Sequence, residues 1–217
     1  MALQPVIFRL FVSSVHKLRT VCTESIRFLV IIVLPIIVSV IVLSDRIIVL
    51  IFKEDFLPSA HALSITIWIL LFYSFNQVLA TVLIGGDYQR KNLEANLIGL
   101  AAIIGLNLIL IPRFSFIGAA CATCTSVIIV ATIQYHYVAK NLFRINFVKF
   151  IQKPLAAAAL MAGVLFLCRN GNLVIITIMS AATYVLCLLG LRTFSKKDVE
   201  LLRNLWEGKT TFNGISS

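Results

Sequence analysis

Apolar residues dominate six stretches of this chain, and short polar segments separate them. The stretches cover approximately 28–43, 60–84, 97–111, 116–139, 154–168 and 173–191. Most are near the roughly 20 residues that a helix needs to cross about 30 Å of hydrocarbon, although 97–111 and 154–168 are short. The first stretch extends to Phe52 if Asp45 and Arg46 lie at the membrane surface. The pattern predicts an all-α integral membrane protein with six transmembrane helices.

Proline and glycine mark a bend and an end in the first two stretches. Pro35 has no N–H, so the carbonyl four residues earlier loses its usual helical donor. We expect a bent helix in which neighbouring helices or shifted geometry satisfy that carbonyl. Gly85 and Gly86 follow the second stretch and predict a left-handed C-terminal cap.

Basic residues lie mainly in alternate connections. Lys and Arg number 15 within 9–27, 90–91, 140–153 and 192–209, and 4 within 46–53, 113 and 169. Because cytoplasmic loops retain Lys and Arg, both termini are expected to be cytoplasmic. The formal net charge of +10 is therefore attributed to topology rather than to nucleic-acid binding.

Composition supports the same class. The chain of 217 residues is 60% hydrophobic and 13% charged, with a mean hydropathy of +1.00, whereas soluble proteins average roughly 45–50% apolar and about 25% charged residues. Five cysteines, mostly within or beside apolar stretches, do not indicate a disulfide framework. Cys121 and Cys124 form a C-x-x-C pair inside an apolar helix, where helix packing is a better interpretation than metal binding.

Four parts follow from this pattern. We expect the end of a helix and a basic cytoplasmic loop in 1–27, four transmembrane helices in 28–139, a basic loop with two further transmembrane helices in 140–191, and a cytoplasmic tail in 192–217. The apolar start is too short to cross a membrane alone. It fits either a helix whose beginning is absent or an interfacial amphipathic helix.

The tail itself carries a helix signal. Ser195 and Asp198 match a capping box, and an apolar stripe beside basic residues follows them. A helix lying on the cytoplasmic membrane surface and one packing on the spans both fit.

Motifs for catalysis or nucleotide binding are missing from the sequence, including H-E-x-x-H, G-x-S-x-G and G-x-x-x-x-G-K-[ST]. His16, His61 and His136 are isolated from one another. We therefore do not expect an enzyme, a cofactor or a metal. None of the six stretches has an ionisable residue at its centre, which argues against a self-contained ion pathway.

Four side-chain amides lie within the apolar stretches. They are Asn76, Gln77, Asn107 and Gln134. An unpartnered amide in hydrocarbon costs several kcal/mol, so each amide either links helices or lines a polar path.

Several segments together carry a resemblance. They are I-I-V-L-I-F-K-E-D-F at 47–56, A-N-L-I-G-L at 95–100, G-L-N-L-I-L-I-P at 105–112 and F-I-G-A-A-C-A-T at 116–123. The chain resembles the C-terminal part of the multidrug/oligosaccharidyl-lipid/polysaccharide flippase superfamily, in its O-antigen and teichoic-acid exporter branch. Lys53 stands where that branch usually has glycine, and Phe114–Ser115 where it has a tyrosine-glycine pair.

The resemblance implies the last six of fourteen helices of a MATE-like fold. Such a protein alternates between inward- and outward-facing states. It moves undecaprenyl-diphosphate-linked oligosaccharides across the bacterial cytoplasmic membrane, often with a coupled cation. The partners implied are the bilayer, the lipid-linked substrate and an N-terminal lobe from the same gene or a partner chain. In a flippase, the four amides are expected to approach the central cavity.

Two alternatives stay open. One is a self-associating membrane scaffold in which Asn76 and Asn107 join helices. The other is a membrane enzyme acting on lipid-linked sugars, for which Asp45, Glu54 and Asp55 form the one acidic cluster available.

Overall fold

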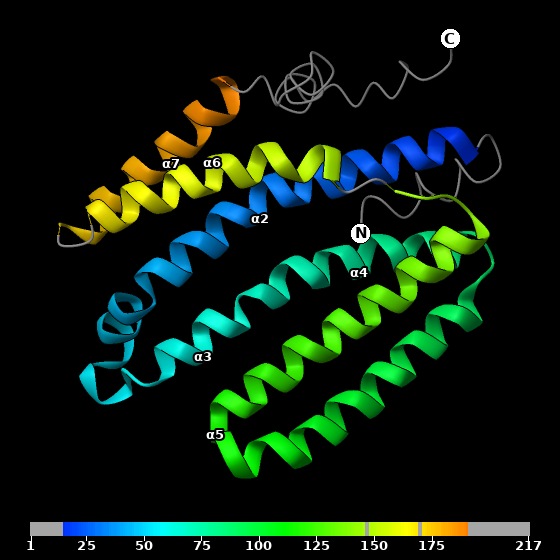
Figure 1. Ribbon diagram of the computed structural model, residues 1–217, viewed down its shortest axis with the longest axis horizontal. Coiled ribbons are helices and arrows are strands. Elements are labelled where there is room, and N and C mark those ends of the chain that lie inside the picture. Colours follow the sequence, from blue (N-terminus) through cyan, green and yellow to red (C-terminus); the bar gives the residue numbers. More distant parts are fainter. Residues whose placement is uncertain (1–14, 146–147, 169–170, 191–217) are drawn as a thin grey trace.

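The protein folds as a bundle of helices (Figure 1). The computed structural model describes residues 15–145, 148–168 and 171–190. The helices in these residues are α2 (Val15–Phe52), the short 3-10 helix η1 (Glu54–Phe56), α3 (Ser59–Thr66), α4 (Trp68–Gly85), α5 (Gln89–Asn141), α6 (Val148–Leu167) and α7 (Leu173–Gly190). The predicted amphipathic helix of the tail and residues 1–14 lie outside the described residues. From Val15 to Arg27, where the end of a helix and a basic loop were predicted, the chain is helical and forms the start of α2. The loop was expected from the basic residues, but Leu18, Cys22 and Ile26 continue the buried face of the helix.

Helix α2 runs through Pro35 without a break. One face of it is buried, with Leu18, Cys22, Ile26, Val30, Leu34 and Ile37 following one another at helical spacing. The carbonyl freed by Pro35 belongs to Ile31, and the hydroxyl of Tyr184 in α7 donates to it over 2.9 Å. A neighbouring helix thus supplies the missing donor, as the sequence led us to expect.

The end of α4 differs from the predicted cap. Gly86 has φ −87° and is not left-handed. Asp87, at φ 64°, takes the left-handed position instead, and the N–H of Tyr88 donates to the carbonyl of Leu83 over 2.8 Å. This bond is the one that closes a Schellman motif, so the prediction was wrong by one or two residues because Asp, like Asn, tolerates positive φ.

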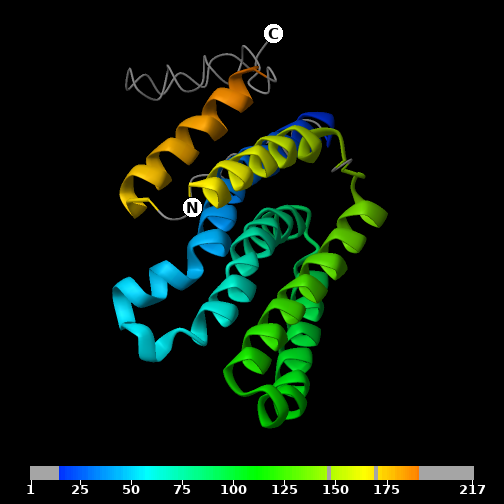
Figure 2. The same ribbon diagram turned by 60° about the vertical axis from the view of Figure 1, so that its left-hand side comes forward.

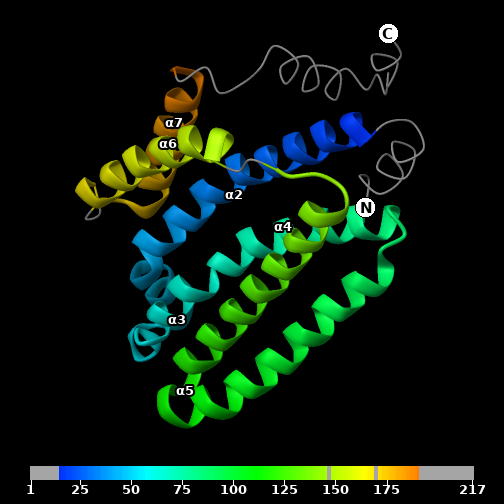
Figure 3. The ribbon, with the colours of Figure 1, turned by 45° about the vertical axis from the view of Figure 1, so that its right-hand side comes forward.

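Helix α5 is a hairpin of two antiparallel arms (Figures 1 and 3). It turns at Ser115, whose φ of 52° and ψ of −131° are not helical, three residues after Pro112. Small residues let the arms approach closely: a Cβ atom at Gly99 would collide with the side chain of Val130. The hydroxyl of Ser126 donates to the carbonyl of Gly99 over 2.8 Å, which adds a buried bond between the arms.

The elements form two neighbouring groups. Helices α6 and α7 lie beside α2, while the hairpin α5 packs on α3 and α4 (Figure 2). Helix α2 also contacts α3 and α4 and so joins the groups. The apolar core runs along this junction and includes Leu34, Leu79, Leu83 and Met161.

Three helical stretches are long and apolar enough to cross a membrane by length and composition, namely Leu18–Phe52, Ser59–Gly85 and Gln89–Asn141. The apolar helices Ile151–Leu167 and Ile175–Gly190 are shorter. The fold back at Ser115 divides the third stretch into arms that contain the predicted spans 97–111 and 116–139. The all-helical membrane class predicted from the sequence is therefore confirmed, while the domain boundaries and the orientation stay predictions.

Candidate functional site

Helix α4 presents its two adjacent amides in different directions. The side-chain amide of Asn76 donates to the carbonyl of Val127 in the second arm of α5, over 3.3 Å. Gln77 is exposed, and its Nε2 donates to the hydroxyl of Tyr73 over 2.9 Å. Asn76 therefore links two helices, whereas Gln77 and Tyr73 form a polar pair on an open face of an apolar helix.

The arms of α5 carry a second set of polar contacts. Gln134, 1% exposed, donates through Nε2 to Oδ1 of Asn92 over 2.9 Å. Within the described part of the chain, the buried Oε1 of Gln134 and Oδ1 of Asn76 and Asn107 have no hydrogen-bond partner. Gln134 thus joins the arms, and the three amides keep acceptors that water or a further polar group could satisfy.

A charged cluster lies at the end of the α5 hairpin that is opposite the turn at Ser115. Lys91 pairs with Glu94 at 2.9 Å, and the hydroxyl of Tyr137 donates to the same carboxylate over 3.1 Å. The ammonium of Lys91 lies 5.4 Å from the ring centroid of Tyr137. Lys91 and Glu94 both belong to the first arm and are partly solvent-accessible, so their ion pair adds little stability. The bond from Tyr137 to Glu94 is the contact of this cluster that joins the two arms.

Three of the four predicted pathway residues have different hydrogen-bond partners in the structure. Gln134 donates a hydrogen bond to Asn92, Asn76 to the second arm of α5 and Gln77 to Tyr73. That all four approach a central cavity remains a prediction. Three residues that hydrogen-bond to the polar groups described above were not identified from the sequence: Tyr73, Asn92 and Tyr137. Tyr73 could have been found, because it lies one helical turn before Gln77.

A shallow hollow of about 350 Å³ lies at the opposite end of the bundle from Arg90. Its lining consists of Asp45, Arg46, Val49, Leu50 and Leu173. Arg46 donates through Nη1 to the carbonyl of Gly171 over 2.8 Å, which ties α2 to the connection between α6 and α7.

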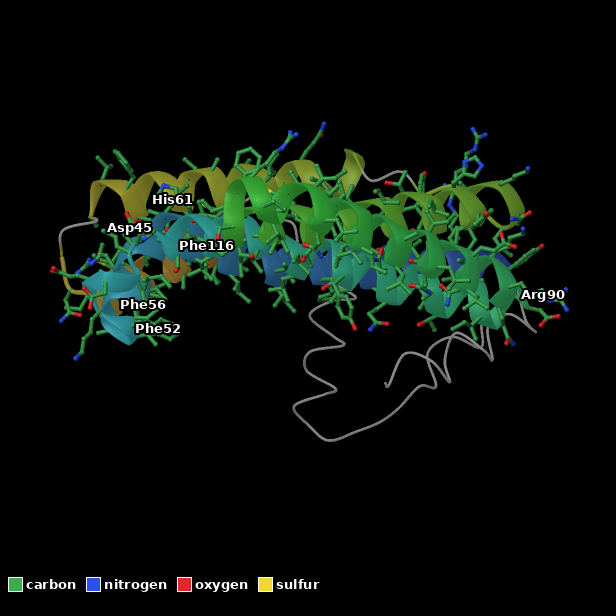
Figure 4. All side chains as sticks on the ribbon, turned by 90° about the horizontal axis from the view of Figure 1, so that it is seen from below. Asp45, Phe52, Phe56, His61, Arg90 and Phe116 are labelled. Carbon is green, nitrogen blue, oxygen red and sulfur yellow. The ribbon has the colours of Figure 1, made fainter. Side chains whose placement is uncertain are left out.

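The three acids considered for catalysis are divided between two settings. Asp45 is half-buried in α2 and lines this hollow, whereas Glu54 and Asp55 are exposed in η1. Figure 4 places Asp45, Phe52, Phe56, His61 and Phe116 at one end of the bundle and Arg90 at the other.

Among the residues described, the five cysteines are free, and no group of three or more His, Cys, Asp and Glu side chains could hold a metal ion. Cys121 and Cys124 are half-buried within one arm of α5. Their position agrees with a packing role.

Comparison with known proteins gives one clear result. The protein-family model described as "Lipid II flippase MurJ" matches residues 2–193. No curated protein matches the chain.

Proposed function

The chain belongs to the lipid II flippase MurJ family, and on this premise we propose that it works as part of a transporter that moves a lipid-linked precursor across the bacterial cytoplasmic membrane. The family match over 2–193 carries this proposal, since it covers every apolar helix of the bundle. A transporter of this class binds and moves its substrate without changing a covalent bond, in keeping with the absence of a catalytic motif from the sequence.

The substrate is the finer part of the proposal. Lipid II is the molecule named in the family description, whereas the resemblance in the sequence pointed to O-antigen or teichoic-acid units on undecaprenyl diphosphate. All are sugars carried on a lipid. We propose a lipid-linked sugar of this class, with lipid II as the first candidate.

The exposed pair of Tyr73 and Gln77 supports a polar path along α4. Both side chains lie within the apolar stretch Ser59–Gly85, where a lipid-facing amide is costly. Water or sugar hydroxyls in a cavity would satisfy the remaining hydrogen-bonding groups of this pair. We propose that this face of α4 lines the path.

Alternating access needs two sets of helices that move relative to each other. We propose that a second lobe, encoded by the same gene or by a partner chain, faces this one and completes the cavity. In the scaffold alternative, Asn76 and Asn107 join helices. Asn76 already joins α4 to α5 within one chain through its bond to Val127, so this bond gives no support to association of separate copies.

The test is a binding and transport experiment on the full chain. Native mass spectrometry in detergent would compare retention of lipid II, an undecaprenyl-diphosphate-linked O-antigen unit and undecaprenyl diphosphate alone. Flipping would then be followed in phosphatidylethanolamine and phosphatidylglycerol vesicles as the share of lipid II that becomes accessible to an impermeant reagent. Selective retention of lipid II is the expected result.

Two variants give this experiment its controls. Gln77→Leu removes the exposed amide, and Leu70→Ala changes a neighbouring exposed apolar residue of the same helix. Retention of lipid II without flipping would support dependence on a second lobe. Failure to retain any lipid-linked sugar would refute the proposal.

A triple variant, Asp45→Asn with Glu54→Gln and Asp55→Asn, separates transport from the enzyme alternative. Because Glu54 and Asp55 are exposed and Asn keeps the shape of Asp45, flipping and expression should change little. Turnover of a lipid-linked sugar by the parent chain, abolished in the triple variant, would instead establish an enzyme.

A further inference from the structure

Helix α2 extends beyond the connection between α6 and α7. Gly171 and Asn172 in that connection are exposed, and they join two short apolar helices, so they mark where α6 and α7 leave the hydrocarbon. The bond from Arg46 to the carbonyl of Gly171 places this part of α2 at the same level, within the reach of one side chain.

Beyond Arg46, α2 continues as a helix for six residues to Phe52, which corresponds to about 9 Å. The next turn of chain forms η1. Six large apolar side chains are exposed here, and the five most exposed of them are Leu50, Ile51, Phe52, Phe56 and Leu57. We name these five residues the apolar tip. Leu50 is 73% exposed and Ile51 is 63% exposed, a degree of exposure that is unfavourable for so many neighbouring apolar residues in water.

Charged residues interrupt the apolar tip. Lys53, Glu54 and Asp55 lie between Phe52 and Phe56, and all three are exposed. The rings of Phe52 and Phe56 lie with their centroids 5.8 Å apart on either side of this charged segment in sequence. Three exposed charges cannot enter the hydrocarbon at low cost, so the tip cannot be wholly immersed.

The backbone of this segment is largely hydrogen-bonded. The N–H of Lys53 donates to the carbonyl of Val49, and that of Leu57 to the carbonyl of Glu54. The N–H of Ala60 donates in turn to the carbonyl of Leu57. A turn that satisfies its own backbone groups can lie in a layer of low water content.

We propose that the apolar tip is a membrane-interface anchor that inserts into the lipid headgroup layer. Its apolar side chains reach the upper acyl chains, and Lys53 contacts lipid phosphates. Apolar side chains next to charged ones suit the bilayer boundary, where the apolar groups enter the acyl region and the charged groups stay in water. The anchor fixes the depth of α2 and α3 and is distinct from the polar face of α4.

Fluorescence quenching in vesicles tests this anchor. The full chain carries Trp68 and Trp206, which are first replaced by Phe, and Phe56→Trp then introduces one reporter. The vesicles contain phosphatidylcholine and phosphatidylglycerol brominated either just below the headgroup or near the chain end. We expect F56W to lose more emission to the shallow bromines than to the deep ones, and to lose little to aqueous iodide.

A control reporter outside the apolar tip and a second reporter within it complete the test. Leu100→Trp, at an exposed position midway along the first arm of α5, should show the reverse depth preference. Phe52→Trp provides an independent reporter in the tip if F56W does not fold. Strong quenching by iodide with none by either lipid would place the tip in water and overturn the proposal. Protection from all three quenchers would overturn it in favour of a covering protein.

Discussion

The hydroxyl of Tyr184 in α7 donates to the carbonyl of Ile31 in α2, over 2.9 Å. Ile31 lies four residues before Pro35, so this carbonyl is the one that the proline deprives of its helical donor. Both residues are buried. Because an unpaired carbonyl in hydrocarbon costs several kcal/mol, Tyr184 both satisfies the proline site and fixes α7 against α2.

Tyr184→Phe should therefore lower the free energy of unfolding by about 1–3 kcal/mol, since it keeps the ring in place but leaves the buried carbonyl of Ile31 without a donor. Unfolding can be followed in mixed micelles by the loss of helical circular dichroism as sodium dodecyl sulfate is added. Flipping should fall no more than the folded fraction does.

The control for this prediction is Pro35→Ala. Alanine restores an N–H that can donate to Ile31, so the cost of Tyr184→Phe should shrink towards zero in that background. Equal costs in the two backgrounds would show that Tyr184 does not act through the proline site.

Glycine at 118 is expected to be essential for the hairpin α5. A Cβ atom there would collide with the backbone carbonyl of Leu110, which cannot move aside as a flexible side chain can. Gly118→Ala should destabilise the protein by about 1–3 kcal/mol. Gly105→Ala is the matched control, because its Cβ meets nothing within 4 Å, and alanine should stabilise the helix by up to about 1 kcal/mol. The same titration measures both, and equal behaviour of the two variants would contradict close packing at Gly118.

Ser115 is held in a backbone conformation that glycine adopts more easily. Its φ of 52° and ψ of −131° are unfavourable for a residue with a Cβ atom, at a cost of about 1–3 kcal/mol. Ser115→Gly should therefore raise the free energy of unfolding by about 1 kcal/mol. Ser115→Ala should be nearly neutral, because it keeps the Cβ atom. A loss of stability in S115G would indicate that the turn is not strained in the membrane.

Local features of the sequence predicted the apolar helices, although α2 begins at Val15, within the predicted basic loop, and the stretch 60–84 is divided into α3 and α4. The length of an apolar stretch, the carbonyl freed by Pro35 and the small residues near Gly118 are all properties of neighbouring positions. The donor for that carbonyl, Tyr184, lies 153 residues from Ile31, and no local pattern could pair them. The cap after α4 was misplaced because glycine was preferred over Asp87 on propensity alone.

The amides illustrate the same limit. Composition shows that Asn76 and Gln77 need partners, but only the rotation of α4 against α5 decides which one turns inward. A rotation of the helix by one residue would exchange their environments, since adjacent residues point about 100° apart. The sequence therefore identifies amides that could line a polar path. It does not show which of them join helices and which are exposed.

Exposed and buried amides are expected to respond differently to substitution. Gln77→Leu removes an exposed group and should reduce flipping while unfolding changes by less than about 0.5 kcal/mol. Tyr73→Phe, which removes the hydroxyl that Gln77 contacts, should act in the same direction.

Gln134→Leu, by contrast, breaks a buried bond to Asn92. It should lower stability by about 0.6 kcal/mol, the average for such bonds between membrane helices. The loss is limited because leucine also removes the unpaired acceptor Oε1, and flipping per folded molecule should be retained. Flipping assays on equal amounts of folded protein, beside the detergent titration, distinguish the two classes. If Q77L flips normally and Q134L fails while folded, the path runs between the arms of α5 rather than along the open face of α4.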